Sequence, residues 1–198
     1  MTTRERNVPH DKHRRMPFGE LDLHGERPVI RFTCHLRHAP AKVWCALTEP
    51  EHLSAWFPTT IDGDRAAGAP LVFRFVDMDL PPMEGIMVAY DPPRLMEFFW
   101  GEDVMRFELQ PTDGGCVLIV TDTVEDLGKA SRDGAGWHVC LERLSHFVSG
   151  TAALPPGFDD RWRLIHPHYV AAFGPEASTL GPPEEYEWAE DERRARSV

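Results

Sequence analysis

Titratable side chains that could exchange a proton with a substrate occur in several parts of this 198-residue chain. The candidates for a general acid or base are Tyr90, Glu97, Asp122 and His138. A general acid or base must lie within hydrogen-bond reach of the reacting atom, and sequence spacing alone does not bring these four together. The chain also carries no G-x-S-x-G elbow, glycine-rich phosphate loop or Cys/His/Asn signature. The sequence therefore leaves open whether the protein is an enzyme.

Histidine and glutamate recur every four residues at His138, Glu142 and His146. Side chains at i and i+4 are neighbours on a helix, so these three could approach one metal ion. Because no further ligand lies nearby in sequence, we favour a solvated stripe with weak charge pairs. In the HPH segment at 166–168, the two histidines lack helical spacing, and Pro167 favours a local structural role. We predict neither a metal site nor a cofactor.

Arg74, Glu97 and Arg106 form a second polar set, on predicted strands. If they face inward, they could anchor a carboxylate or phenol at the base of a cavity. If they face outward, they are cross-strand ion pairs worth about a few tenths of a kcal/mol. A one-residue change of register decides between the two, and the aromatic alternation on these strands favours the outward position.

Large apolar side chains are the candidates for the wall of a ligand cavity. Aromatic rings give shape and stacking to a planar or greasy ligand, although aromatic stripes also occur simply as packed cores. The predicted cavity wall consists of Trp56, Phe57, Phe73, Phe75, Trp100, Phe107, Trp137, Leu141 and Leu144.

The elements that must position these residues follow from periodicity. The segment 29–36 alternates apolar and polar residues, which predicts a half-buried strand, and Pro40 and Pro50 are each placed to begin a short helix. From Pro70 on, five short apolar runs separated by turn signals predict antiparallel strands. In GAGWHVCLERLSHFVSG, the apolar residues from Trp137 to Val148 share one face, which predicts an amphipathic helix over residues 136–149.

This order predicts an α+β fold in which a long helix covers the apolar face of a curved antiparallel sheet. We divide the chain into a charged leader (1–27), a ligand-cavity domain (28–152), a helical appendage (153–175) and an acidic tail (176–198). Pro167 is expected to break the helical spacing of the appendage. The appendage either packs on its own domain or forms a homodimer contact.

The composition of the chain argues against several classes of function. The net charge of −11 argues against nucleic-acid binding, and no stretch is apolar and long enough for membrane insertion. Neither a secretory signal peptide nor a C-x-x-C pair is readable, so we expect a cytoplasmic protein with four buried free thiols.

Four segments, in order, resemble the START and polyketide-cyclase-like (SRPBCC) superfamily, and most closely the bacterial homologues of the activator of Hsp90 ATPase. They are HAPAKVWCALTEPEHLSAWF, Gly85 followed by DPPRLMEFFWG, MRFELQPTDGGCVLIVTDT, and GWHVCLERLSHFVSG. The resemblance implies a helix-grip fold with a hydrophobic cavity between the sheet and the long helix. Relatives bind lipids, hormones or polyketides, some cyclise aromatic polyketides, and the eukaryotic activator binds a chaperone.

From the residues and the resemblance together, we predict that the protein binds a small hydrophobic or aromatic molecule between sheet and helix. Two alternatives remain. One is a cyclase or hydrolase on the same cavity, which requires an internal ionisable group with a shifted pKa. The other is a chaperone-associated interaction module, which uses the outer sheet face or the surface around Trp162 and Tyr169 and requires an exposed apolar patch.

Overall fold

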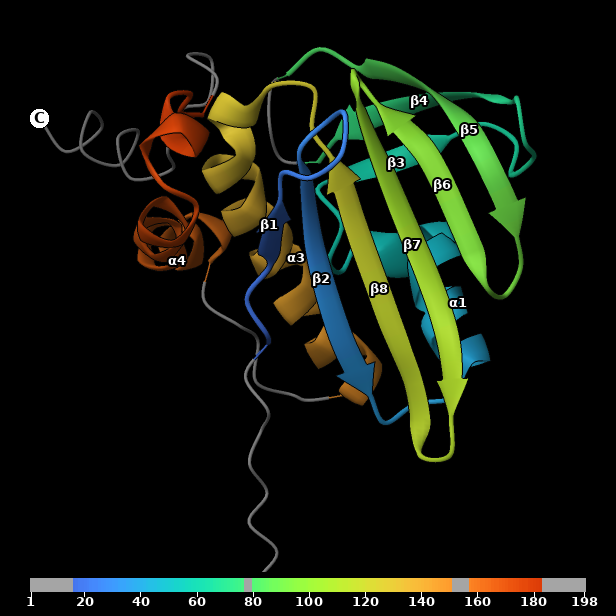
Figure 1. Cartoon of the computed structure of the whole chain (residues 1–198). Coiled ribbons are helices and arrows are strands. Elements are labelled where there is room, and N and C mark those ends of the chain that lie inside the picture. Colours follow the sequence, from blue (N-terminus) through green and yellow to red (C-terminus); the bar gives the residue numbers. More distant parts are fainter. Residues whose placement is uncertain (1–15, 77–79, 151–156, 183–198) are drawn as a thin grey trace, which may run out of the picture.

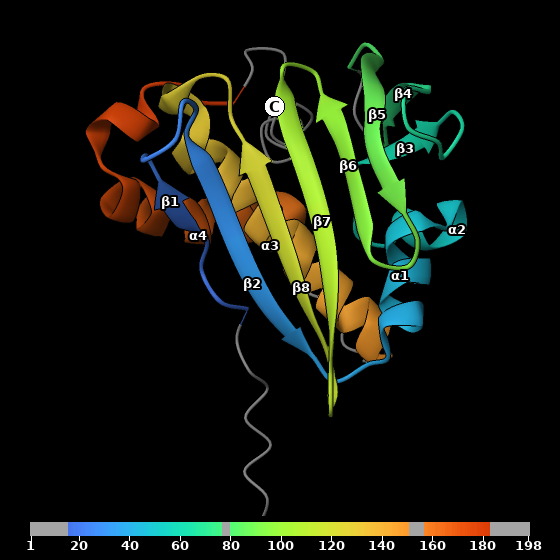
Figure 2. The same cartoon turned by 45° about the vertical axis from the view of Figure 1, so that its right-hand side comes forward.

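The computed structural model describes residues 16–76, 80–150 and 157–182. Eight antiparallel strands form one curved sheet in the order β1-β2-β8-β7-β6-β5-β4-β3, and α3 lies across its concave face (Figures 1 and 2). The strands are β1 (Glu20–Asp22), β2 (Val29–Leu36), β3 (Thr59–Asp62), β4 (Pro70–Phe75), β5 (Met83–Asp91), β6 (Leu95–Trp100), β7 (Asp103–Thr112) and β8 (Gly115–Thr123). The helices are α1 (Pro40–Thr48), α2 (Pro50–Leu53), α3 (Ala130–Ser149) and α4 (Phe158–Phe173), with 3-10 turns η1 (Leu127–Lys129) and η2 (Pro175–Ser178).

The predicted alternation of the strands is confirmed. In β2, Ile30, Phe32 and Cys34 face the core while the residues between them are exposed. The hairpin of β6 and β7 pairs Met96 with Phe107, so apolar side chains from both strands share the inner face. The two short helices also begin where predicted, at Pro40 and Pro50. The fold is therefore a helix-grip fold of the α+β class.

The long helix begins at Ala130, so the predicted start at Gly136 is wrong. Glycine weakens a helix but does not end it when tertiary packing compensates. A Cβ at Gly134 would lie 2.9 Å from a ring carbon of Tyr169, so glycine here permits close approach of α3 and α4. The predicted glycine stop is confirmed, because Gly150 adopts a left-handed conformation with φ 63°.

The predicted break at Pro167 is also wrong, because α4 continues through it to Phe173. Trp162, Ile165 and Tyr169 are buried, so packing stabilises the helix despite the lost backbone hydrogen bond. The appendage packs on its own domain, with α4 beside α3 (Figure 1). It offers no exposed surface at Trp162 or Tyr169 for a partner protein.

Described secondary structure lies near two of the predicted segment boundaries. Residues 20–22, inside the predicted leader, form β1 and pair with β2, and η2 lies at the junction of the appendage and the tail. Residues 1–15 of the leader, 151–156 around the first appendage boundary and 183–198 of the tail lie outside the described residues. Among the helices that are described, none combines the length and apolarity needed to cross a membrane.

Candidate functional site

A cleft of about 200 Å³ opens where the β6–β7 turn meets α3 and α4. Four aromatic residues line it: Trp100 ends β6, Trp137 lies on α3, and Phe158 and Trp162 come from α4. Gly136 forms part of the wall, and a Cβ built there meets no described atom within 4 Å. The cleft therefore has aromatic walls and open space beside the helix.

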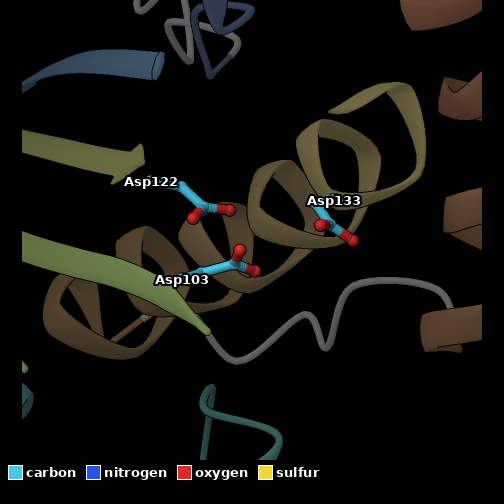
Figure 3. A group of neighbouring side chains, drawn as sticks. All are labelled: Asp103, Asp122 and Asp133. Carbon is cyan, nitrogen blue, oxygen red and sulfur yellow. The ribbon is translucent and has the colours of Figure 1, made fainter. Parts of the chain in front are cut away.

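Three aspartates also line this cleft, each from a different element (Figure 3). Asp122 comes from the end of β8, Asp103 begins β7 and Asp133 lies in the first turn of α3. One carboxylate oxygen of each lies within 4.8 Å of the other two. The site thus concentrates acidic groups next to aromatic rings.

Asp122 occupies an inward position that its strand otherwise fills with apolar side chains. Leu118 and Val120 precede it on the same face of β8, and Asp122 itself is only 2 % exposed. The indole Nε1–H of Trp137 donates to Asp122 Oδ2 at 3.0 Å. Within the described part of the chain, Oδ1 is buried without a hydrogen-bond partner. One oxygen of Asp122 is therefore fixed by the helix and the other is unused.

The other two aspartates each have a cationic partner. Lys129 Nζ donates to Asp103 Oδ2 at 2.7 Å, and the backbone N–H of Glu125 donates to Oδ1 at 2.8 Å. The guanidinium of Arg132 donates from Nε to Asp133 Oδ1 at 2.6 Å. Among the described residues, cations therefore pair with Asp103 and Asp133, and none pairs with Asp122.

Burial raises the pKa of Asp122 well above its usual value, and the neighbouring Asp133 and Asp103 raise it further. The Trp137 hydrogen bond and Lys129 oppose this shift without cancelling it. Burial also raises the pKa of Asp133, against the opposing effect of Arg132. Because an unpaired buried charge is costly, this position favours the protonated form of the Asp122 carboxyl group.

The cleft residues also allow metal binding and thiol chemistry to be assessed. Three carboxylates at this spacing could meet one metal ion, but Lys129 and Arg132 already hold oxygens of Asp103 and Asp133. Cys140 faces the cleft, yet burial raises the pKa of its thiol to about 12, so the reactive thiolate is not formed near neutral pH. Proton donation by Asp122 is the chemistry that the arrangement supports best.

Of the nine predicted cavity residues, Trp100 and Trp137 line the cleft. Phe57 packs against both of these rings, with centroids 5.4 and 5.7 Å away. Further predicted residues back the pair: Phe73 and Phe75 contact Trp100, Phe107 contacts Trp137, and Trp56 contacts Phe57 and Phe107. Leu141 and Leu144 are buried elsewhere in the core. A ligand-binding role for the set stays a prediction.

Of the four acid–base candidates, Asp122 alone lines the cleft. The inward position of Asp122 could be predicted from the sequence, because alternation along β8 places this carboxyl group on the apolar face. The sequence analysis missed three other cleft residues, because tertiary structure brings them there. Asp133 reaches the cleft through the early start of α3, Asp103 through the β6–β7 turn, and Trp162 through the docking of α4. Tyr90 contacts Trp44 instead.

The solvated stripe predicted on α3 is wrong for His138 and Glu142, because α4 covers them. His138 Nδ1 lies 3.0 Å from the Tyr169 hydroxyl, and its Nε2 lies 3.4 Å from Glu142 Oε1. Arg161 of α4 donates two hydrogen bonds to Glu142, at 2.7 and 2.6 Å. In the HPH segment, His166 stacks on Trp162 and His168 stacks on Phe18. These residues hold α4 in place.

The outward register predicted for Arg74, Glu97 and Arg106 is confirmed. Glu97 and Arg106 are direct cross-strand partners that form an ion pair outside the buried core. Arg74 does not join them and pairs with Asp62 of β3, at 2.9 Å. This outer cluster is separate from the cleft.

The cleft and the wrapped helix place the chain among helix-grip domains, and sequence comparison names the family. Residues 37–149, more than half of the chain, match the model described as "Activator of Hsp90 ATPase homolog 1-like protein", so the chain belongs to this family. A search of the curated proteins finds no match.

Solved structures with the same fold are distant in sequence. CalU16 from Micromonospora echinospora is 19% identical, with a TM-score of 0.61 over 79% of this chain and 94% of that one. EF2215 from Enterococcus faecalis, a conserved protein of unknown function, is 19% identical, with a TM-score of 0.64 over 77% and 88%. An AHSA1-like protein from Aeromonas hydrophila is 17% identical, with a TM-score of 0.53 over 62% and 92%. These likenesses support the fold alone.

Proposed function

We propose that the protein binds a small planar aromatic molecule in the cleft between the end of the sheet, α3 and α4. The observation that carries this proposal is the aromatic lining by Trp100, Trp137, Phe158 and Trp162. Planar ligands stack favourably on such rings without strong directional demands. Membership of a family with a ligand-binding fold supports the same function.

The size and rigidity of the cleft favour a compact ligand. Its volume of about 200 Å³ lies below the range of about 300–1,000 Å³ for drug-sized ligands. Trp100 and Trp137 contact each other edge to face at 5.9 Å, and Phe57 packs behind both. A wall held in this way is preformed, so little ordering accompanies binding.

The experiment uses Gly136, a cleft-lining position where a Cβ would meet no described atom within 4 Å. Two- and three-ring aromatic compounds are titrated into the full-length protein, and the Trp indole N–H signals are followed by NMR. We expect saturable shifts in the native protein and in Gly136→Ala, and their loss in Gly136→Trp. Equal binding to Gly136→Trp and the native protein would contradict the proposed site.

Acid–base catalysis in the same cleft is a second candidate, and Asp122 favours it. The enzyme hypothesis required an internal ionisable group with a shifted pKa, and burial raises the pKa of Asp122. A protonated carboxyl group beside a ligand can act as a general acid. Conversion of a bound compound, detected by mass spectrometry and lost in Asp122→Asn with binding retained, would support this function. Binding without conversion would leave the ligand-binding function alone.

The proposal includes a cytoplasmic location. Free thiols support it, because Cys34, Cys45, Cys116 and Cys140 are all unpaired and disulfides are rare in reducing compartments. Fractionation of the native host would test this location, and recovery in an oxidising compartment would contradict it.

A further inference from the structure

We propose that Asp122 is the specificity-determining residue of the cleft and acts as a neutral carboxylic acid whose Oδ1–H donates a hydrogen bond to a carbonyl oxygen of an aromatic ligand. This inference rests on the proposed function, because it specifies which aromatic molecules the cleft prefers. It assigns the ligand class as planar aromatic ketones, quinones or lactams rather than plain hydrocarbons or organic cations.

The geometry fixes which oxygen of Asp122 carries the proton. Oδ2 accepts the Trp137 indole N–H, so it serves as the hydrogen-bond acceptor. Oδ1 is buried and has no partner among the described residues, although Asp122 lines the cleft. A protonated carboxyl group has one O–H donor, and the free oxygen is where that donor can lie. A buried donor without a partner is costly, and a ligand oxygen would satisfy it.

The charges around Asp122 favour the neutral acid over an ionised group that binds a cation. Lys129 is held by Asp103, and Arg132 is held by Asp133. Ionisation of Asp122 would therefore add a third carboxylate charge to a cluster whose cations are already paired with Asp103 and Asp133. Burial and both neighbouring aspartates raise the pKa of Asp122, in agreement with this count.

Groups that could alter the protonation of Asp122 come from each neighbouring element. Asp103 lies at the start of β7, and Lys129 lies just before α3. Asp133, Arg132 and Cys140 belong to α3. The described residues of α4 that line the cleft, Phe158 and Trp162, carry no ionisable group. Arg27 approaches Asp103, at 4.0 Å, from the segment before β2. The cations in this set therefore have carboxylate partners other than Asp122.

A ligand cation fits less well, because it would enter beside Lys129 and Arg132. A carbonyl oxygen has no such conflict, since it carries no net charge. It can accept from Oδ1–H while the rings of Trp100 and Trp137 contact the aromatic plane.

The test compares 9-fluorenone with fluorene, two probes of the same shape that differ in one carbonyl group. Dissociation constants are measured from the Trp indole N–H signals of full-length protein at pH 6. A net hydrogen bond is worth about 0.5–1.5 kcal/mol, so we expect fluorenone to bind about 2- to 13-fold more tightly. Asp122→Leu is expected to bind both probes equally, whereas Asp122→Asn, which keeps an N–H donor, retains the preference.

The pH dependence of the fluorenone preference is a second readout. A variant that only disturbed packing around Asp122 would not change it. The preference of the native protein for fluorenone is expected to disappear as pH rises and Asp122 ionises. In Asp122→Asn it is expected to be independent of pH. Asp122→Asn also preserves size and polarity, so the test holds even if Asp122→Leu does not fold.

The outcomes separate this inference from the function on which it rests. Binding of both probes with equal affinity to the native protein would overturn the role of Asp122 and leave aromatic binding intact. Stronger binding of the cation 9-aminoacridine, or Trp137 shifts on addition of Mg²⁺, would also overturn it, because either requires an ionised cluster. If neither fluorene nor fluorenone binds, the proposed function fails and this inference fails with it.

Discussion

Asp122 of β8 and Glu142 of α3 are both largely buried carboxyl groups, and their pKa values are shifted in opposite directions. Burial opposes ionisation of Glu142, but hydrogen bonds from Arg161 and His138 lower its pKa to about 2. Asp122 receives one neutral N–H, and burial raises its pKa. The difference follows from the hydrogen bonds to a cationic partner that Glu142 has and Asp122 lacks among the described residues. Ionised Glu142 holds α4 on α3, and Asp122, with its raised pKa, lines the cleft.

The largest expected effect on stability comes from Trp162→Ala, which should make Asp122 less buried. Trp162 is 8 % exposed and forms part of the cleft wall. Loss of a buried Trp costs about 3–5 kcal/mol, so we expect a Tm lower by roughly 10 °C. Water entering the cleft should also lower the pKa of Asp122. Trp162→Phe is the control that keeps an aromatic wall, and an unchanged Asp122 titration in Trp162→Ala would contradict this explanation.

Glu142→Gln removes the ionised partner of Arg161. We expect a loss of about 2 kcal/mol in the free energy of unfolding at pH 7, measured by urea denaturation. Because the pKa of Glu142 is lowered to about 2 in the folded protein, its contribution is present above the ordinary Glu value of about 4.3 and disappears as pH falls toward 2.

The difference between the native protein and Glu142→Gln should therefore narrow between pH 4 and pH 2. Arg161→Met should lower the free energy of unfolding by a similar amount. The double variant should be little less stable than either single variant. Fully additive effects would show that the Glu142–Arg161 contact does not stabilise the protein.

Asp122→Asn should have the opposite pH dependence. A raised pKa contributes stability that is present below the ordinary Asp value of about 3.9 and is lost as pH rises through the folded value. At pH 5, we expect the free energy of unfolding of Asp122→Asn to differ from that of the native protein by no more than about 1 kcal/mol. Between the ordinary value of about 3.9 and the raised folded pKa, the advantage of the variant in free energy of unfolding should grow by up to about 1.4 kcal/mol per pH unit, and above the folded pKa it should stay constant. Urea denaturation from pH 5 to pH 9 measures this, and a constant difference would show that Asp122 titrates normally.

The smallest effect is expected on the outer sheet face. Glu97 and Arg106 form an ion pair that is partly exposed, with side-chain exposures of 20 % and 39 %. Glu97→Gln should change the free energy of unfolding by about 0.5 kcal/mol, and less at high salt. It should not alter ligand binding. A loss of fluorenone binding in this variant would mean that the binding site lies elsewhere.

Local periodicity predicted six of the eight described strands, missing the short β1 and β3. It also predicted the short helices and the outward position of Glu97 and Arg106, because each depends on residues close in sequence. The same alternation marks Asp122 as a polar residue on an apolar face. The full cleft could not be predicted in this way. It depends on the docking of α4, which buries Trp162 and places Arg161 on Glu142, and on a close approach at Gly134 that no periodicity reports.

The most direct test of the central claim is the protonation state of Asp122 itself. Protein labelled with ¹³C at the aspartate carboxyl carbons is titrated by NMR, and the Asp122 signal is identified by its absence in Asp122→Asn. The neutral-acid role predicts that this signal keeps the chemical shift of a protonated carboxyl group at pH 7, while exposed aspartates are ionised. An Asp122 signal that titrates near pH 4 together with the surface aspartates would contradict it.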